Sequence, residues 1–346
     1  MGEMLKRLRK WVRMLLDVPV LLTGLAIFTV RGTTPEFAYR SLLSLFLASG
    51  GRSNDWITRA FALVLPQYQL SSRSGVLGDP GQAELRHLCT DLEERGYHVF
   101  EKKLPPPMLE SLLRYARTGE CRITVNCDGT RNLNQQKVHY RGDRPEGLLY
   151  VFDTQDVINH PIVGQLFADS SLLSLAQAYL KNPPVLDMPS LWWSTAAATQ
   201  ASSDGAQMYH FDLDRVKWLK FFFYLTDVGP GNGPHMFVSG SHLSSGIAPQ
   251  LLARGYVRHS DREIAEAYDP KQVVELTGGR GTIIAVDTRG LHKGKHVETG
   301  ERLMLQLQFS ASLFGTTYPP AHFAATQAST LAGMIEKYPR LYSLFR

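Results

Sequence analysis

The sequence predicts a mainly β protein with flanking helices, in which antiparallel strands form a double sheet. Helical patterns come first along the chain, and after about residue 148 short apolar segments alternate with turn residues. Most of these segments are bounded by Gly, Pro or Asp, and they cover residues 192–198, 216–225, 281–287 and 302–312. Helices followed by many short strands favour layered antiparallel sheets with helices outside them.

The composition is that of an ordinary folded protein, with 44% hydrophobic and 20% charged residues in a chain of 346. This length accommodates one large domain with an appendage. The three cysteines, Cys89, Cys121 and Cys127, are odd in number and contain no CxxC pair. We therefore expect no disulfide framework and no structural zinc site, and a reducing compartment, the cytoplasm.

The basic charge is concentrated at the N-terminus. Six basic and two acidic residues lie within residues 1–32, a net charge of +4, whereas the whole chain carries +5. A nucleic-acid-binding protein usually carries its positive charge on the folded domain, as a patch interleaved with aromatic residues. The sequence therefore predicts no nucleic-acid partner.

Residues 1–32 have the pattern of a basic amphipathic helix. Leu and Val residues recur at helical spacing over residues 4–18, with basic residues on most of the remaining surface. We expect Pro19 to interrupt this helix, which leaves an apolar run over residues 18–30, shorter than the roughly 20 residues needed to span a bilayer. The pattern favours binding to an anionic membrane surface without crossing it, on the inner face of a membrane.

Two alternatives to a membrane-surface helix stay open for this segment. It is either a helix packed on the protein's own domain or a secretory signal peptide. Asp17 and the large residues around Thr29 make a poor cleavage site, which weighs against the signal peptide.

The rest of the chain divides into two predicted regions. Residues 33–83 form an accessory helical region, with helical patterns broken by Gly50-Gly51 and Pro66, followed by a linker rich in Ser and Gly. Residues 84–346 form the main domain. Its first elements are a helix over residues 83–96, a strand over 97–102 and a helix over 108–117.

An HxD motif at the end of a strand has metal-binding potential. Strand side chains alternate, so His210 and Asp212 lie on one face, and a distant histidine completes a 2-His-1-carboxylate set. Such a set leaves positions open for an oxoacid and dioxygen, and it is typical of non-haem Fe(II) oxygenases. The same spacing occurs at His259/Asp261 and His296/Glu298. His210/Asp212 directly precedes a predicted strand, whereas His259/Asp261 lies in a polar stretch that predicts a solvated surface pair.

The segment from His210 to Arg302 resembles the phytanoyl-CoA dioxygenase family of Fe(II)/2-oxoglutarate-dependent oxygenases. It contains HFD at 210–212, LTDVGPGNGPHMFVSGSH at 225–242, DTRGLHKG at 287–294, and an arginine ten residues after His292. The stretch LEERGYHVFEKKLPPPMLESLL at 92–113 is similar to the family's helix, strand and helix. The resemblance covers about residues 84–312, and it implies a double-stranded β-helix (jelly roll, cupin-like) core.

The resemblance implies specific site residues. His210, Asp212 and His292 are the expected Fe(II) ligands, and Arg302 is the expected partner of the distal carboxylate of the cosubstrate 2-oxoglutarate. His296 is the rival for the third ligand, although it lies closer to Arg302 than the family spacing allows. Related enzymes often carry a hydroxyl residue two positions after the arginine, where this chain has Met304.

Several further residues have open roles. His235 and His242 either reach the cleft or hold turns, and Trp192-Trp193 and the run from Phe221 to Phe223 are expected to fill the core. Basic residues close to the ligands in sequence are expected either to be solvated or to form a positive rim for an anionic substrate. They are Arg215, Lys217, Arg289, Lys293 and Lys295.

The function implied is that of a dioxygenase that hydroxylates an unactivated C–H bond. Asp212 favours hydroxylation, because halogenating relatives lack this carboxylate. The basic N-terminus and the basic residues near the ligands point to an anionic, membrane-associated substrate, either an acyl lipid or the acidic sugar of a glycolipid such as lipopolysaccharide. The alternatives are a soluble natural-product intermediate as the substrate, or a non-catalytic jelly-roll binding module. The sequence does not indicate an oligomeric state.

Overall fold

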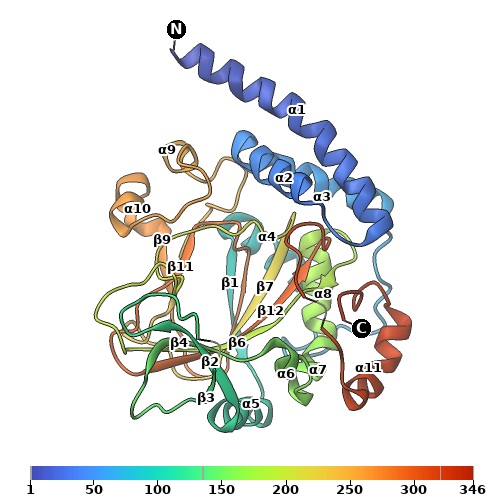
Figure 1. The fold of residues 1–346 in the computed structure, drawn as a ribbon. Helices are drawn as coiled ribbons and strands as arrows, with labels where there is room; N and C mark the ends of the chain where they lie inside the picture. Colours follow the sequence, from blue (N-terminus) through green and yellow to red (C-terminus); the bar gives the residue numbers. More distant parts are fainter. Residues whose placement is uncertain (1, 135, 320, 346) are drawn as a thin grey trace.

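Two antiparallel β-sheets form the centre of the molecule in this computed structural model, which describes residues 2–134, 136–319 and 321–345, with side chains from residue 13 onward (Figure 1). The larger sheet has nine strands, with β1, β10, β7, β12, β6, β4, β2 and β3 in spatial order and β5 paired to β12. The smaller sheet has the order β11, β8, β9. This is the double-stranded β-helix (jelly roll) expected from the sequence.

The strands are short, apart from β12, and their bounds are as follows: β1 Tyr97–Lys103, β2 Glu120–Asn126, β3 Lys137–His139, β4 Gly147–Val151, β5 Val185–Leu186, β6 Ser190–Thr195, β7 Trp218–Tyr224, β8 His235–Val238, β9 Val273–Leu276, β10 Thr282–Val286, β11 His292–Gly294 and β12 Glu301–Ser310. The helices that flank them are α4 Gln82–Arg95, α5 Pro106–Thr118, α6 Thr154–Ile158, α7 Pro161–Phe167, α8 Ser170–Leu180, α9 Pro249–Leu252, α10 Asp261–Ala267 and α11 Ala325–Lys337, with a 3₁₀ turn at Pro270–Gln272.

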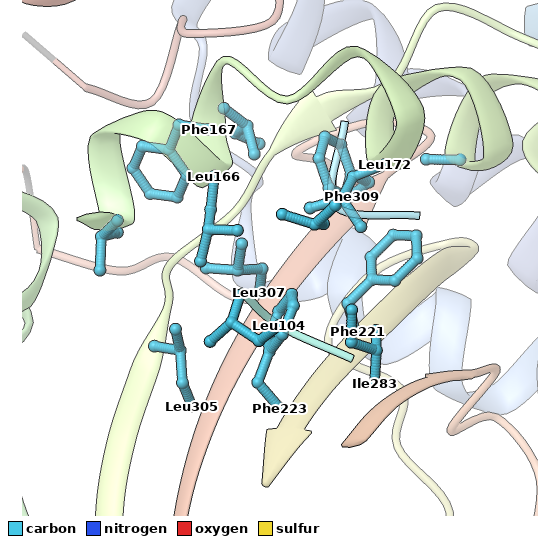
Figure 2. Packing of buried hydrophobic residues seen from close by; sticks show 14 of the residues in the cluster. Leu104, Leu166, Phe167, Leu172, Phe221, Phe223, Ile283, Leu305, Leu307 and Phe309 are labelled. Carbon is cyan, nitrogen blue, oxygen red and sulfur yellow. The ribbon is translucent and has the colours of Figure 1, made fainter. Parts of the chain in front are cut away.

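Alternation along β7 and β12 divides the core into two layers. Phe221 and Phe223 of β7 point to the outer face of the large sheet, where they pack with Leu305 and Leu307 beneath α7 and α8 (Figure 2). Phe222 points to the opposite face and packs between the two sheets, together with Tyr224, Met304 and Phe237. The sequence expectation that this aromatic run is buried on both faces is correct.

The N-terminal 64 residues add three helices: α1 Gly2–Arg31, α2 Glu36–Ser49 and α3 Arg52–Val64. The expected break at Pro19 is wrong, because α1 continues through it. Proline removes one backbone hydrogen bond, and packing of the following turns on α2 compensates for that loss. Arg13–Arg31 is consequently a 19-residue helical stretch that is long and apolar enough to cross a membrane by length and composition, with a mean hydropathy of 1.7.

The two sides of α1 differ in their surroundings. Leu21, Leu25 and Phe28 pack against α2 and Phe314. The helices cross so closely that a Cβ added at Gly24 would lie 2.0 Å from the Cβ of Ala38. On the other side, apolar side chains are exposed, with Leu15 70%, Leu16 66% and Leu22 60% accessible. The N-terminal half of α1 projects beyond the rest of the molecule (Figure 1).

Polar contacts join these helices to the jelly roll. Asp55 of α3 accepts a hydrogen bond of 2.9 Å from the buried Arg289, and Asn54 donates to the carbonyl of Val216. The stretch expected as a linker also packs on the main domain, because Val76 and Leu77 are buried and their backbone N–H groups donate to Asp169 and Ser171. The limits predicted for the three regions stay predictions.

Candidate metal centre and cosubstrate site

His210, Asp212 and His292 converge between the two sheets. The segment that carries His210 and Asp212 runs beside β11, and the backbones of His210 and His292 exchange hydrogen bonds of 2.9 and 2.8 Å. The backbone N–H of Asp212 donates to Thr288, in the loop before β11, at 2.8 Å. Each of the three side chains offers one ligand atom, and these atoms lie within 4.8 Å of one another.

Hydrogen bonds fix the orientation of both imidazoles. The Nδ1 atom of His210 lies 2.9 Å from the carbonyl oxygen of Met208, and Nδ1 of His292 lies 2.9 Å from that of Gly290. The Nε2 atoms therefore face Asp212, at 3.7 Å for His210 and 3.5 Å for His292. A metal-binding histidine typically has its second ring nitrogen held in this way. The donor set and its geometry fit Fe(II).

The protonation states of these residues favour metal binding. Burial and the proximity of His292 lower the pKa of His210 well below its ordinary value, and burial also lowers the pKa of His292. Burial alone would raise the pKa of Asp212, but the positive charge of Lys220 holds it far below its usual range. The imidazoles are therefore neutral and the carboxyl is ionised, as metal coordination requires.

Lys220 is a site residue that the sequence analysis missed. It lies on β7, is only 7% exposed, and donates a 2.7 Å hydrogen bond to Oδ2 of Asp212. The alternation of β7 puts it on the same face as Phe222, between the sheets. The only sequence signal is a lysine within an otherwise apolar strand, since the contact with Asp212 depends on the fold.

Arg302 lies on β12 with its guanidinium buried and without a carboxylate partner among the described residues. One Nη atom donates to the carbonyl of Gly233, the other to the hydroxyl of Ser194 at 3.1 Å, and the buried Nε has no partner in the described part of the chain. Burial lowers the pKa of Arg302. An unpaired buried cation is costly, and the arrangement fits an arginine that receives an anion such as the distal carboxylate of 2-oxoglutarate.

Ser194 supplies a hydroxyl that the sequence analysis did not find. β6 pairs with β12 so that Ser194 lies opposite Arg302. Met304, where relatives often have a hydroxyl residue, packs instead among the apolar side chains between the sheets. The Asn232-Gly233 turn also contributes, because Gly233 has a left-handed φ of 71° and its carbonyl accepts from Arg302. The β6–β12 register brings Ser194 here, and no local sequence pattern indicates it.

The other candidate histidines lie apart from the three convergent residues, except for His235. Nδ1 of His296 lies 3.3 Å from Oε1 of Gln207, so the structure brings His292 and not His296 to Asp212. The ring of His235 is buried, with its centroid 5.3 Å from that of His292. The buried ring of His242 lies near Phe237. His259 is also buried, which corrects the expectation of a solvated pair with Asp261, because its backbone pairs with Tyr209.

The expected positive rim is not present in the form predicted, because most of its members are paired with acidic residues. Arg215 binds Asp187, Arg289 binds Asp287 and Asp55, Lys293 binds Asp261, and Lys295 binds Glu275. Lys217 packs on the ring of Tyr179 and is partly buried, and the loss of hydration lowers its pKa to about 8. Most of these charges are therefore compensated within the fold, although Lys217 and Lys295 stay partly exposed.

Arg258 is a cation beside the candidate metal ligands, and it has no acidic partner among the described residues. Tyr209 and His259 form an antiparallel bridge, so the next residues along the two segments, His210 and Arg258, lie opposite each other and direct their side chains to the same face. One buried Nη of Arg258 has no partner among the described residues. Its charge contributes to the lowered pKa values of His210 and His292.

Solved structures similar to this chain include iron enzymes. The epimerase SnoN, in complex with Fe3+, alpha ketoglutarate and nogalamycin RO, has a TM-score of 0.46 and 16% identity over 66% of this chain and 84% of SnoN. EctD from S. alaskensis with bound Fe has a TM-score of 0.46 and 18% identity over 74% of this chain and 86% of EctD. No curated protein matches the chain.

The sequence model of the phytanoyl-CoA dioxygenase (PhyH) family matches residues 92–303, which is more than half of the chain. The matched region contains the three convergent side chains and Arg302. The chain therefore belongs to the phytanoyl-CoA dioxygenase family, and it is an Fe(II)- and 2-oxoglutarate-dependent dioxygenase.

Proposed function

We propose that the protein hydroxylates an unactivated C–H bond of an anionic, membrane-associated substrate. In this proposal His210, Asp212 and His292 hold Fe(II), and Arg302 binds the distal carboxylate of 2-oxoglutarate. The observation that carries the proposal is the convergence of three ligand atoms within 4.8 Å, in a jelly roll that also buries Arg302 without an acidic partner among the described residues.

The chain's own residues orient the reactants and exclude water. Bound iron and 2-oxoglutarate supply the oxidising chemistry, in which dioxygen, 2-oxoglutarate and a C–H bond give succinate, CO2 and a C–OH group. Arg302 and Ser194 fix one end of the cosubstrate by charge-assisted hydrogen bonds. Phe222, Tyr224 and Met304 keep the space between the sheets apolar. Lys220 keeps Asp212 ionised.

Arg258 and α1 support the proposed substrate class. Arg258 places a guanidinium without an acidic partner among the described residues beside His210, where it would bind a carboxylate or phosphate on the substrate. α1 exposes apolar side chains and is strongly basic in its first half. A helix of this kind binds anionic bilayers, and it would present the iron centre to molecules held there. The protein would then be cytoplasmic and peripheral on the inner face of a membrane.

Replacement of either histidine ligand is expected to abolish metal binding. His210→Ala and His292→Ala should each lose Fe(II) binding, measured anaerobically by calorimetry, and reduce conversion of 2-oxoglutarate to succinate to background. His296→Ala is the matched control and should retain both properties, because it lies outside the cluster. Retention of turnover in His292→Ala together with its loss in His296→Ala would reassign the third ligand.

Arg302→Ala should weaken 2-oxoglutarate binding by about 2–4 kcal/mol, because a charged partner of the carboxylate is removed. This corresponds to a rise in Kd of roughly 30- to 1000-fold, measured by titration of the metal-loaded protein. Ser194→Ala should cost only about 0.5–1.5 kcal/mol, the value of one hydrogen bond. Metal affinity should not change in either variant. An unaltered Kd in Arg302→Ala would move the cosubstrate anchor to another residue.

Arg258→Gln should remove recognition of the anionic substrate without affecting the iron centre. We expect an anionic lipid fraction to stimulate succinate formation by the wild-type protein and to stimulate Arg258→Gln at least tenfold less. Turnover without lipid should stay the same. Arg262→Gln is the control, since this exposed arginine on α10 pairs only with Glu266 among the described residues. Equal stimulation of wild type and Arg258→Gln would exclude Arg258 as the anion site.

Exposed apolar residues of α1 should determine membrane binding. The double variant Leu15→Glu, Leu16→Glu should sediment less than wild type with phosphatidylcholine vesicles containing phosphatidylglycerol. Binding should increase with the anionic fraction, by about 1 kcal/mol for each basic residue near the surface, and decrease with salt. Point variants are preferable to deletion of residues 1–32, because deletion would expose the part of α2 that α1 covers. Leu133→Glu, on a distant exposed site, is the control. Sedimentation that is independent of lipid charge, or identical in the double variant, would contradict membrane attachment.

A further inference from the structure

A large groove lies between the three N-terminal helices and the loop after β8. Its volume is about 1140 Å³, and it is lined by α1, α2, α3 and residues 245–255. Small-molecule sites usually have volumes of about 300–1,000 Å³, so the groove has room for a long chain. The described lining includes none of the three convergent side chains, so the groove is separate from the candidate metal centre. Phe46 of α2 lies outside the lining and stacks on Phe211, with ring centroids 5.6 Å apart.

The lining of the groove is mostly apolar. Leu22 and Leu25 come from α1, Leu45 and Ala48 from α2, Trp56 from α3, and Ile247 from the loop. Trp56 is 64% exposed and Leu22 60%, so large apolar side chains are accessible to solvent along its walls. Contiguous exposed apolar surface of this kind marks an interaction site.

Two arginines give the groove a charged edge. The side chain of Arg13 on α1 is 73% exposed and reaches Asp17 only at 3.8 Å. Arg52, the first residue of α3, is exposed and has no acidic partner within the described residues. An apolar groove with two cations complements an amphiphile that has a hydrocarbon chain and an anionic headgroup.

We propose that this groove binds one acyl chain of an anionic phospholipid from the bilayer, with Arg13 and Arg52 on its phosphate. The bilayer is the source because α1 forms one wall of the groove and also carries the exposed apolar residues that would insert into lipid. Gly255 lines the groove and lies three residues before Arg258, so one loop connects the groove to the segment beside His210. The inference rests on the proposed membrane association, but it does not depend on iron chemistry.

The experiment measures lipid bound to the metal-free full-length protein. The protein is incubated with phosphatidylglycerol vesicles, separated from them by flotation, and analysed by native mass spectrometry. We expect one phosphatidylglycerol per chain, and at least tenfold less bound lipid in Ala48→Trp and in Ala253→Trp, which fill the groove from opposite walls. The exposed site of Ala253 makes its variant tolerant of the larger side chain. Leu133→Trp, outside the groove, should bind as wild type does.

The outcomes separate this inference from its alternatives. Absence of stably bound lipid in the wild type, or equal binding by the groove variants and Leu133→Trp, would overturn it, even where vesicle sedimentation and succinate formation succeed. Phosphatidylcholine bound as well as phosphatidylglycerol would overturn the role of Arg13 and Arg52. A dimer that dissociates in Ala48→Trp, measured by light scattering, would assign the groove to a second copy of the chain. Circular dichroism and thermal unfolding identify any variant that does not fold.

Discussion

The pair of backbone hydrogen bonds between His210 and His292 determines the geometry of the proposed metal centre. These bonds join two segments separated by more than 80 residues and place both imidazoles on one side of Asp212. β11 is only three residues long, so its position depends on pairing with β8 and on this bridge. A second bridge, between Tyr209 and His259, extends this ladder and places Arg258 beside His210. Lys293 packs on the ring of Tyr209. The positions of the three candidate ligands and of the Arg258 guanidinium therefore depend on one short ladder of paired segments.

Two buried cations in the jelly roll have opposite surroundings, which explains their different proposed tasks. Lys220 is neutralised by Asp212 at 2.7 Å and stabilises a carboxylate that is poised for metal binding. Arg302 has only neutral partners among the described residues, a carbonyl and a hydroxyl. An uncompensated buried charge costs about 3–5 kcal/mol, and a fold optimised for stability alone would not retain one. The binding of an anion would offset this cost. The neutral surroundings of Arg302 therefore favour an anionic cosubstrate.

The sequence predicts much of the site because its main residues lie in local motifs. HFD, the Asn-Gly turn and the spacing from His292 to Arg302 can be read directly, and the strand run of β7 indicates the layered sheets. Ser194, Lys220 and Arg258 were missed because their contacts depend on strand register, which a single sequence does not show. The error at Pro19 has a different physical origin. Local propensity favours a break there, but packing of Leu21 and Leu25 on α2 stabilises a continuous helix.

The continuous helix α1 could contact a bilayer in two ways, by spanning it or by lying in its surface. Arg13–Arg31 is long enough to span one, yet spanning would remove the helix from α2. That separation would expose Leu42, Leu45 and Phe314, which are now buried, and each fully buried side chain of this size contributes about 1.5–3 kcal/mol. A helix that lies in the interface keeps this contact and still inserts Leu15 and Leu16, which lie outside the groove. The two-sided environment of α1 therefore favours surface attachment, with the groove between α1 and α3 facing the lipid.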